Sequence, residues 1–139
     1  MYKFKNRNTM KQYLKITISL LFVALVWSGC YDTPIDENGL LITESSICYM
    51  SMFELMGPDN RTVLTSSVVD TTACTVTAVA KFGTNIKHVK PHCSLATDAK
   101  LEPAMGVWTD FTQPRQYTVI SGNRQVRKTY TITVTVQGQ

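Results

Sequence analysis

Short runs of apolar residues, separated by turn-forming residues, fill the chain from Leu40 onward. No window of this part sustains the 3.6-residue period of a long amphipathic helix, so β-strands are predicted instead. The clearest alternation covers 129–136, where the apolar residues from Tyr130 to Val136 share one face and four threonines share the other. This alternation predicts a half-buried antiparallel strand with a hydroxyl-rich outer face.

The other apolar runs extend the same β pattern through the chain. The run 47–55 carries apolar residues on both faces, which predicts a strand buried between two layers, with Met50, Met52 and Met56 as core filler rather than ligands of a soft metal. About seven short strands, with turns every 8–12 residues, favour an all-β fold, an antiparallel β-sandwich. The further strands and strand-like stretches are 61–69, 73–80, 86–96, 107–111 and 117–120.

A different pattern precedes this β region. Residues 16–27 form an uncharged apolar run behind Lys11 and Lys15, and its length suits the apolar core of a signal peptide rather than a membrane span. The run closes on Ser28, Gly29 and Cys30, the small residues and cysteine that a lipoprotein signal peptidase requires. Residues 1–29 are therefore predicted to be a lipoprotein signal peptide, with Cys30 as the site of lipid attachment and of contact with the membrane.

Two residues of the leader, at positions 27 and 10, affect how it is interpreted. Position 27 is a tryptophan where such signals usually carry a branched aliphatic residue, so an ordinary secretory signal or an uncleaved anchor is the alternative. Met10 begins a more typical leader than Met1 does, and the mature chain would be the same from either start.

The segment 30–43 follows the predicted lipidated cysteine. It is polar and acidic between residues 31 and 39 and is broken by Pro34 and Gly39, which predicts a flexible tether to a domain at 44–137. An acidic cluster in this place resembles the export signal of Bacteroidota outer-membrane lipoproteins. The expected location is therefore the outer membrane, facing the cell exterior, with its periplasmic face as the alternative.

The net charge changes once the leader is set aside. The whole chain carries a formal charge of +4, but residues 1–29 hold five basic residues and no acidic ones. Cleavage before Cys30 would leave 110 residues with nine basic and ten acidic side chains. A nucleic-acid partner is therefore not expected, because it would require clustered Lys and Arg on the folded part.

The residues that could hold a metal or form a disulfide are few. His88, His92 and Cys93, with Cys74, lack a recognised zinc spacing, and Pro91 interrupts any helix that would align the two histidines. No metal or other cofactor is predicted. With Cys30 lipidated, Cys48, Cys74 and Cys93 allow at most one disulfide, and three buried thiols are an equal alternative.

Catalytic motifs are equally scarce, and no enzyme is predicted. The sequence contains no Gly-x-Ser-x-Gly elbow, His-Glu-x-x-His or phosphate-binding loop. Nothing in it sets the separation between two carboxylates that glycoside cleavage requires. The available carboxylates are Glu54, Asp59, Asp70, Asp98, Glu102 and Asp110.

Distinct short motifs lie in the segments 69–77, 82–86, 91–103, 108–114, 117–119 and 128–134. Through these motifs the region 44–137 resembles the immunoglobulin-like or cadherin-like domains of Bacteroidota surface lipoproteins, many of which are linked to polysaccharide-utilisation loci. This sequence departs from the usual pattern of those domains at Asn85 and Thr112. The resemblance implies a sandwich fold and a surface compartment, with Asp110 and Pro114 shaping a bend. Phe111 and Tyr130 would then fill the core, and Gly122 would serve a turn.

Two non-catalytic functions are consistent with these features. The first is a surface-anchored spacer or scaffold, or an accessory glycan-contacting domain, of a carbohydrate-utilisation system. Trp108 and Tyr117 are the candidate sugar-stacking residues, with Tyr49 and Tyr31, although a small sandwich usually buries its large aromatic residues. The second is an adhesin-like or fimbria-like assembly subunit that binds a partner surface protein through an edge strand at 129–136.

Overall fold

The computed structural model describes residues 11, 13, 15, 16, 18 and 33–138. The chain divides into two compact units, Met1–Thr33 and Pro34–Gln139. Residues 11, 13, 15, 16 and 18 of the first unit are helical, and no helix among the described residues is long and apolar enough to cross a membrane. Met10, Trp27, Cys30 and Tyr31, and with them the predicted lipid-attachment site, lie outside the described residues.

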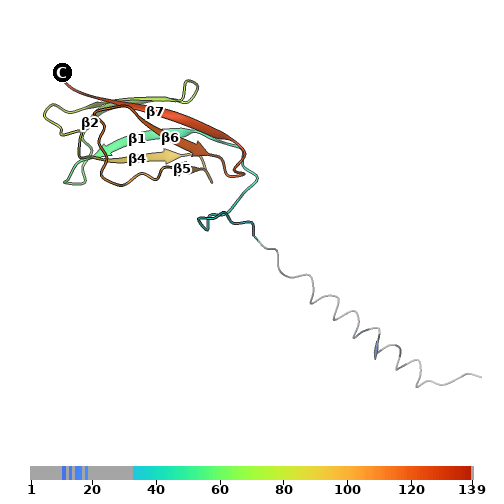
Figure 1. The fold of residues 1–139 in the computed structure, drawn as a ribbon. Coiled ribbons are helices and arrows are strands. Elements are labelled where there is room, and N and C mark those ends of the chain that lie inside the picture. The colour runs from blue at the N-terminus through green and yellow to red at the C-terminus, as the bar shows by residue number, and fades with distance from the viewer. Residues whose placement is uncertain (1–10, 12, 14, 17, 19–32, 139) are drawn as a thin grey trace, which may run out of the picture. The chain divides into compact units, whose positions relative to one another are not determined.

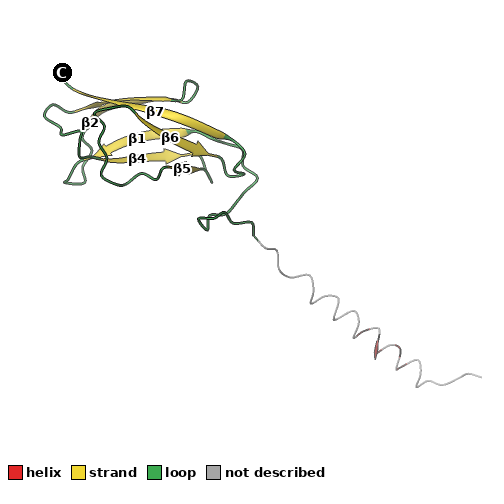
Figure 2. Cartoon of the chain, viewed as in Figure 1, coloured by secondary structure: helices red, strands yellow, loops and turns green. Residues whose placement is uncertain are grey.

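The second unit consists of seven strands in two sheets (Figures 1 and 2). A two-stranded sheet pairs β1 with β4, and a five-stranded sheet has the order β2-β3-β7-β6-β5. The prediction of an all-β sandwich is confirmed. The strands are β1 (Met50–Met56), β2 (Leu64–Asp70), β3 (Thr75–Ala80), β4 (Lys90–Leu95), β5 (Lys100–Glu102), β6 (Arg115–Ile120) and β7 (Arg127–Val136).

Strand β7 is the centre of the larger sheet. Its alternation is confirmed, because the side chains of Tyr130, Ile132, Val134 and Val136 are buried. Residues 127–132 pair antiparallel with β6, and residues 131–136 pair parallel with β3. The parallel pair departs from the fully antiparallel sheet that the sequence predicted. The prediction of an edge strand at 129–136 is wrong, because β7 has β3 on one side and β6 on the other.

Contacts across the layers close the core. The backbone N–H of Met50 in β1 donates a hydrogen bond to the Tyr130 hydroxyl in β7 at 3.3 Å. The rings of Phe53 and Phe111 meet edge to face, with 6.1 Å between centroids. Burial raises the pKa of the Tyr130 hydroxyl, so this group stays neutral in the core. Phe111 and Tyr130 therefore fill the core, as the family resemblance implied.

Strand β1 differs from its prediction. A β-bulge between Met50 and Met52 shifts the alternation by one residue, so that Met50 and Phe53 are both buried. Ile47, Tyr49 and Met52 are exposed. The expectation that both faces of 47–55 are buried is therefore wrong, and of Met50 and Met52 only the first fills the core.

The stretch 107–111 is a loop rather than a strand. It makes one isolated antiparallel bridge, between Val89 and Thr109. Asp110 accepts hydrogen bonds from the backbone N–H and the hydroxyl of Thr112, and this local turn ends any extended pairing. Strand β5 was not predicted, because three residues are too few to show an alternation.

The three cysteines of the sandwich are free thiols, with Cys48 buried and Cys74 and Cys93 half-buried. The Cys48 thiol donates to the carbonyl of Val119 at 3.2 Å. Of the two alternatives that the sequence left open, the structure shows unpaired thiols.

The segment from Pro34 to Thr43 is bound to the sandwich, which corrects the prediction of a flexible tether for these residues. One Asp36 oxygen accepts the backbone N–H groups of Asn38 and Leu40. The other lies 3.2 Å from Lys100 Nζ and 3.1 Å from Arg124 Nη2. The acid that composition assigned to a solvated linker is therefore the residue that fastens the linker, and its side chain is only 8% exposed.

Gly122 lies where this N-terminal segment passes over the β6–β7 loop. The backbone N–H of Thr43 donates to the Gly122 carbonyl at 3.1 Å, and the N–H of Asn123 donates to the Ser45 carbonyl at 2.8 Å. A Cβ at Gly122 would overlap Thr43 Oγ1 and lie 2.9 Å from the Asp98 Cβ. Close approach of two backbones explains the glycine here, in addition to the turn.

We expect Gly122→Ala to destabilise the sandwich by about 1–3 kcal/mol, because the added methyl group has no space. Urea unfolding of the variant and the parent protein measures the difference. Adding Thr43→Ala removes the hydroxyl that the methyl group overlaps and should restore part of the loss. An unchanged unfolding midpoint in Gly122→Ala would contradict the close approach.

We expect Asp36→Ala to release the segment 34–42 without unfolding the sandwich. Hydrogen exchange at the amides of Asn38 and Leu40 should accelerate, while exchange at the core of β7 stays slow. Glu37→Ala, an exposed neighbour, is the matched control and should leave both rates unchanged.

Acid should have the same effect as Asp36→Ala. The backbone N–H of Leu40, followed by the Lys100 ammonium group, lowers the pKa of Asp36 in the folded protein below 3.8. The stabilisation is therefore complete above the unfolded pKa and is lost as the pH falls through the lower folded value. Release of the segment between pH 5 and 7 would contradict this prediction.

Candidate functional site

The loops of the sandwich gather at two opposite poles. The segments 57–63, 81–89 and 103–114 and the end of β7 lie at one pole, called here the loop pole (Figure 1). The N-terminal segment 34–49 enters at the opposite pole, beside the turns 71–74, 96–99 and 121–126. Ten residues of extended strand separate the two poles by about 30 Å.

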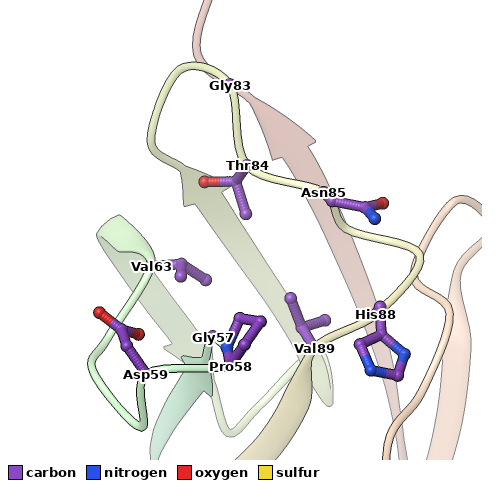
Figure 3. A pocket seen from close by; sticks show the side chains of 9 residues that line it. All are labelled: Gly57, Pro58, Asp59, Val63, Gly83, Thr84, Asn85, His88 and Val89. Carbon is purple, nitrogen blue, oxygen red and sulfur yellow. The ribbon is translucent and has the colours of Figure 1, made fainter.

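A shallow hollow of about 350 Å³ opens at the loop pole (Figure 3). Gly57, Pro58 and Val63 line it from the β1–β2 turn, and Asn85 and His88 lie on another side. The turns that form it are fixed by their own hydrogen bonds. Asp59 accepts the N–H of Arg61 at 3.2 Å, and Asn85 Oδ1 accepts the N–H of Lys87 at 3.2 Å. The hollow combines an apolar floor with polar groups on rigid turns.

Trp108 lies next to this hollow and is held by two neighbours. Its ring stacks on the His88 imidazole, with 4.1 Å between centroids and 11° between planes. The Lys90 ammonium lies 4.5 Å from the ring centroid, within the range of a cation–π contact. Trp108 remains 42% exposed, so the alternative that it is a core residue is wrong.

Tyr117, the other predicted sugar-stacking residue, belongs to the core. Its side chain is 5% exposed, and burial raises the pKa of its hydroxyl. It borders a second hollow of about 450 Å³, formed with Val107 and Arg115 among others, but presents no ring face to solvent. The prediction of a glycan contact at Tyr117 is not supported by this position, since stacking needs an accessible ring.

Tyr49 is exposed but lies at the other pole from Trp108. Its carbonyl accepts the N–H of Ala96 at 3.0 Å, at the start of β1, whereas Lys90 and Trp108 flank the opposite end of β4. The structure therefore does not bring the described aromatic candidates together into one platform.

The residues considered as metal ligands are also dispersed. His88 stacks on Trp108, His92 and Cys93 are consecutive residues of β4 and point to opposite faces, and Cys74 lies in the 71–74 turn at the far pole. Among the residues that the structure describes, no three His, Cys, Asp or Glu side chains form a group that could hold a metal.

Several carboxylates have structural roles that keep them ionised. Hydrogen bonds from the backbone N–H of Thr112 lower the pKa of Asp110, and those from Ala73 and Thr72 lower the pKa of Asp70. A general acid for glycoside cleavage needs the opposite shift. Together with Asp36, these residues cap turns or form ion pairs.

Sequence reasoning missed the groups that surround Trp108. His88 and Lys90 flank the buried Val89, and alternation in an extended segment places their side chains on one side. That spacing was the available signal. Phe82, which is exposed beside the loop pole, had no signal, because a single aromatic next to Gly83 indicates only a turn.

Comparisons with known proteins agree with this architecture. The profile of the family described as SGBP, N-terminal, matches residues 59–134, and the chain belongs to this family of N-terminal domains of surface glycan-binding proteins. Membership supports the predicted polysaccharide-utilisation context in Bacteroidota and an association with the cell surface or outer membrane. A search of curated proteins finds no match.

Among solved structures, the chain is similar to a Bacteroides thetaiotaomicron protein that is provisionally described as a glycoside hydrolase. The TM-score is 0.50 and the sequence identity is 23%, over 80% of this chain. This chain spans only 28% of that protein's length. The likeness concerns the fold alone.

The half-buried thiol of Cys93 leads to one prediction. Desolvation raises the pKa of Cys93 to about 11, so at pH 8 only about one molecule in a thousand carries the reactive thiolate. We expect alkylation of Cys93 by iodoacetamide to be slow in the folded protein and fast in urea, as peptide mass spectrometry can measure. Because the unfolded thiol ionises first, the contribution of Cys93 to stability should fall as the pH rises above about 9.

Proposed function

We propose that this chain is a non-catalytic, lipid-anchored spacer of a surface glycan-binding system. In this proposal Cys30 carries the lipid, the N-terminal pole faces the outer membrane, and the loop pole faces outward. The proposal rests on one observation, which is that the first segment and the last strand of the sandwich lie at opposite poles. The segment 34–49 enters at one pole and β7 ends at the other, so the sandwich separates whatever adjoins its two ends by its full length.

The contacts that fasten the N-terminal segment to the sandwich support the role of a spacer. A free linker would let the domain pivot close to its anchor point. Here the Asp36 carboxylate is held by Lys100 and Arg124, and Arg124 Nη2 also donates to the Leu41 carbonyl at 3.1 Å. The segment 34–42 is therefore held against the sandwich and is not free to pivot.

A non-catalytic role is supported by the states of the carboxylates. The acids with altered pKa values are shifted downward by turn amides, and none of these three is placed to donate a proton at neutral pH. The residues that line the hollow at the loop pole include a single carboxylate, Asp59, whereas most glycoside hydrolases use a pair.

An accessory glycan contact is the second candidate, and it rests on Trp108 alone. This residue is exposed at the outward pole beside a hollow with amide and carboxylate groups, a combination that suits a sugar ring. The His88 imidazole already lies against the Trp108 ring, which limits how much of the ring a sugar can cover.

Affinity electrophoresis in gels that contain plant, fungal or bacterial polysaccharides distinguishes the two candidates. For a spacer we expect the mobility of the protein to be the same with and without polysaccharide, and no release of reducing sugar. Retardation that is lost in Trp108→Ala but kept in Tyr49→Ala would replace the spacer with a glycan-contacting module. Sugar release that depends on a single carboxylate would overturn the non-catalytic role.

Anchoring is tested separately. Metabolic labelling with palmitate should mark the parent protein and not Cys30→Ser, and protease treatment of whole cells should digest the parent protein. Labelling that persists in Cys30→Ser would exclude this cysteine as the lipid site. Protection of the protein until the outer membrane is broken would place it on the periplasmic side.

A further inference from the structure

One edge of the larger sheet is open. Among the described residues β2 pairs with β3 alone, and its segment from Leu64 to Val69 carries no charge and no proline. Val68 points away from the core and is 66% exposed. An uncharged edge strand of this length presents unpaired backbone N–H and C=O groups that another strand can use.

The other edges are protected. Strand β5 has three residues, and its Lys100 and Glu102 form an ion pair at 3.1 Å. Strand β4 contains Pro91, whose carbonyl accepts the N–H of Gly106 from the loop that lies against it.

On β1, a bond from the Val63 N–H occupies the Leu55 carbonyl at one end, and the Tyr130 hydroxyl occupies the Met50 N–H at the other. Shortness, charge, proline and covering loops are the usual means of blocking an edge. Over its first six residues β2 carries no charge and no proline, and its β-bulge lies at one end, between Leu64 and Ser66.

We propose that β2 is a self-association edge, at which a second copy of this chain pairs with β2 antiparallel around a two-fold axis at Val68. The β-bulge between Leu64 and Ser66 limits the regular part of the strand to residues 66–70, and Val68 is its midpoint. Pairing about this midpoint places the two exposed Val68 side chains opposite each other, where each shields part of the other from water.

The charges of the strand suit this arrangement. Asp70, the one charged residue of β2, lies opposite the uncharged Ser66 of the other copy, so no like charges meet across the pair. Lys81 lies beyond the Leu64 end and donates to the Thr62 carbonyl at 3.0 Å, so antiparallel pairing directs each Asp70 toward the basic end of the other copy. Residues 34–139 contain nine basic and nine acidic side chains, so net repulsion between copies is small.

A strand of seven residues gives a small interface, and its association in dilute solution should be weak. Confinement to a surface raises the local concentration and favours such pairing. The edge lies along the sheet rather than at either pole, so pairing there leaves the loop pole free. The inference stands without any glycan contact or lipid at Cys30.

Site-specific photo-crosslinking of the full-length chain in detergent tests the edge. Benzoylphenylalanine in place of Val68 should give a product of twice the monomer mass on irradiation, with the crosslink mapped by mass spectrometry to residues 64–70 of the other copy. The matched control carries the same group at Thr133, an exposed position on the same face of β7, two strands away from β2. Several-fold less product is expected from that position.

A charge at the edge provides the second variant. Val68→Lys, introduced with the photo-reactive group at Ser66, should abolish the product because it places two ammonium groups opposite each other, whereas Val68→Thr should retain it. Unchanged thermal melting of Val68→Lys shows that the fold is intact, and Thr133→Lys is the control for added charge.

Equal crosslinking from positions 68 and 133, crosslinks that map outside β2, or no product would each overturn the proposal. In whole cells, a Val68 product of a mass other than twice the monomer would identify a different partner for the edge and would overturn pairing between copies.

Discussion

The hydrogen bond between the Met50 N–H and the Tyr130 hydroxyl holds together the two layers on which the rest of the structure depends. Tyr130 is fully buried in the central strand, and Met50 is fully buried in the smaller sheet. A two-stranded sheet alone is only marginally stable, so β1 and β4 need the face of the larger sheet to persist. The tyrosine supplies apolar area to that face and satisfies a backbone donor that would otherwise be buried without a partner.

The length of β7 sets the topology and, through it, the edges. Because β3 and β6 pair with its two sides, β7 lies inside the sheet, and β2 and β5 become the outer strands. The same arrangement places the end of β7 at the pole opposite the N-terminal segment. Both the proposed spacing role and the proposed self-association edge therefore follow from the position of this strand.

The sequence supported the fold class and the interior face of β7 because both depend on local alternation. It could not place β7 in the sheet, since the partner of a strand is set by contacts between residues far apart in the chain. The bulge in β1 could not be predicted either, because one extra residue changes which face is buried without changing composition. The isolated bridge at Thr109 depends on a contact with Val89, which is distant in the chain. For the candidate site, an exposed Trp108 was one of the alternatives that the sequence allowed. The burial of Tyr117 could not be predicted, because it depends on how β6 packs against the core.

Asp36 shows why composition alone misassigned the N-terminal segment. A run with acids, a proline and a glycine has the composition of a solvated linker, and nothing within it indicates that Lys100 and Arg124 lie nearby in the fold. An acidic cluster that must be read by an export system needs accessible carboxylates, and Asp36 is almost fully covered. An export signal in this segment would have to rest on acids other than Asp36, because the ion pairs of Asp36 fasten the segment to the sandwich.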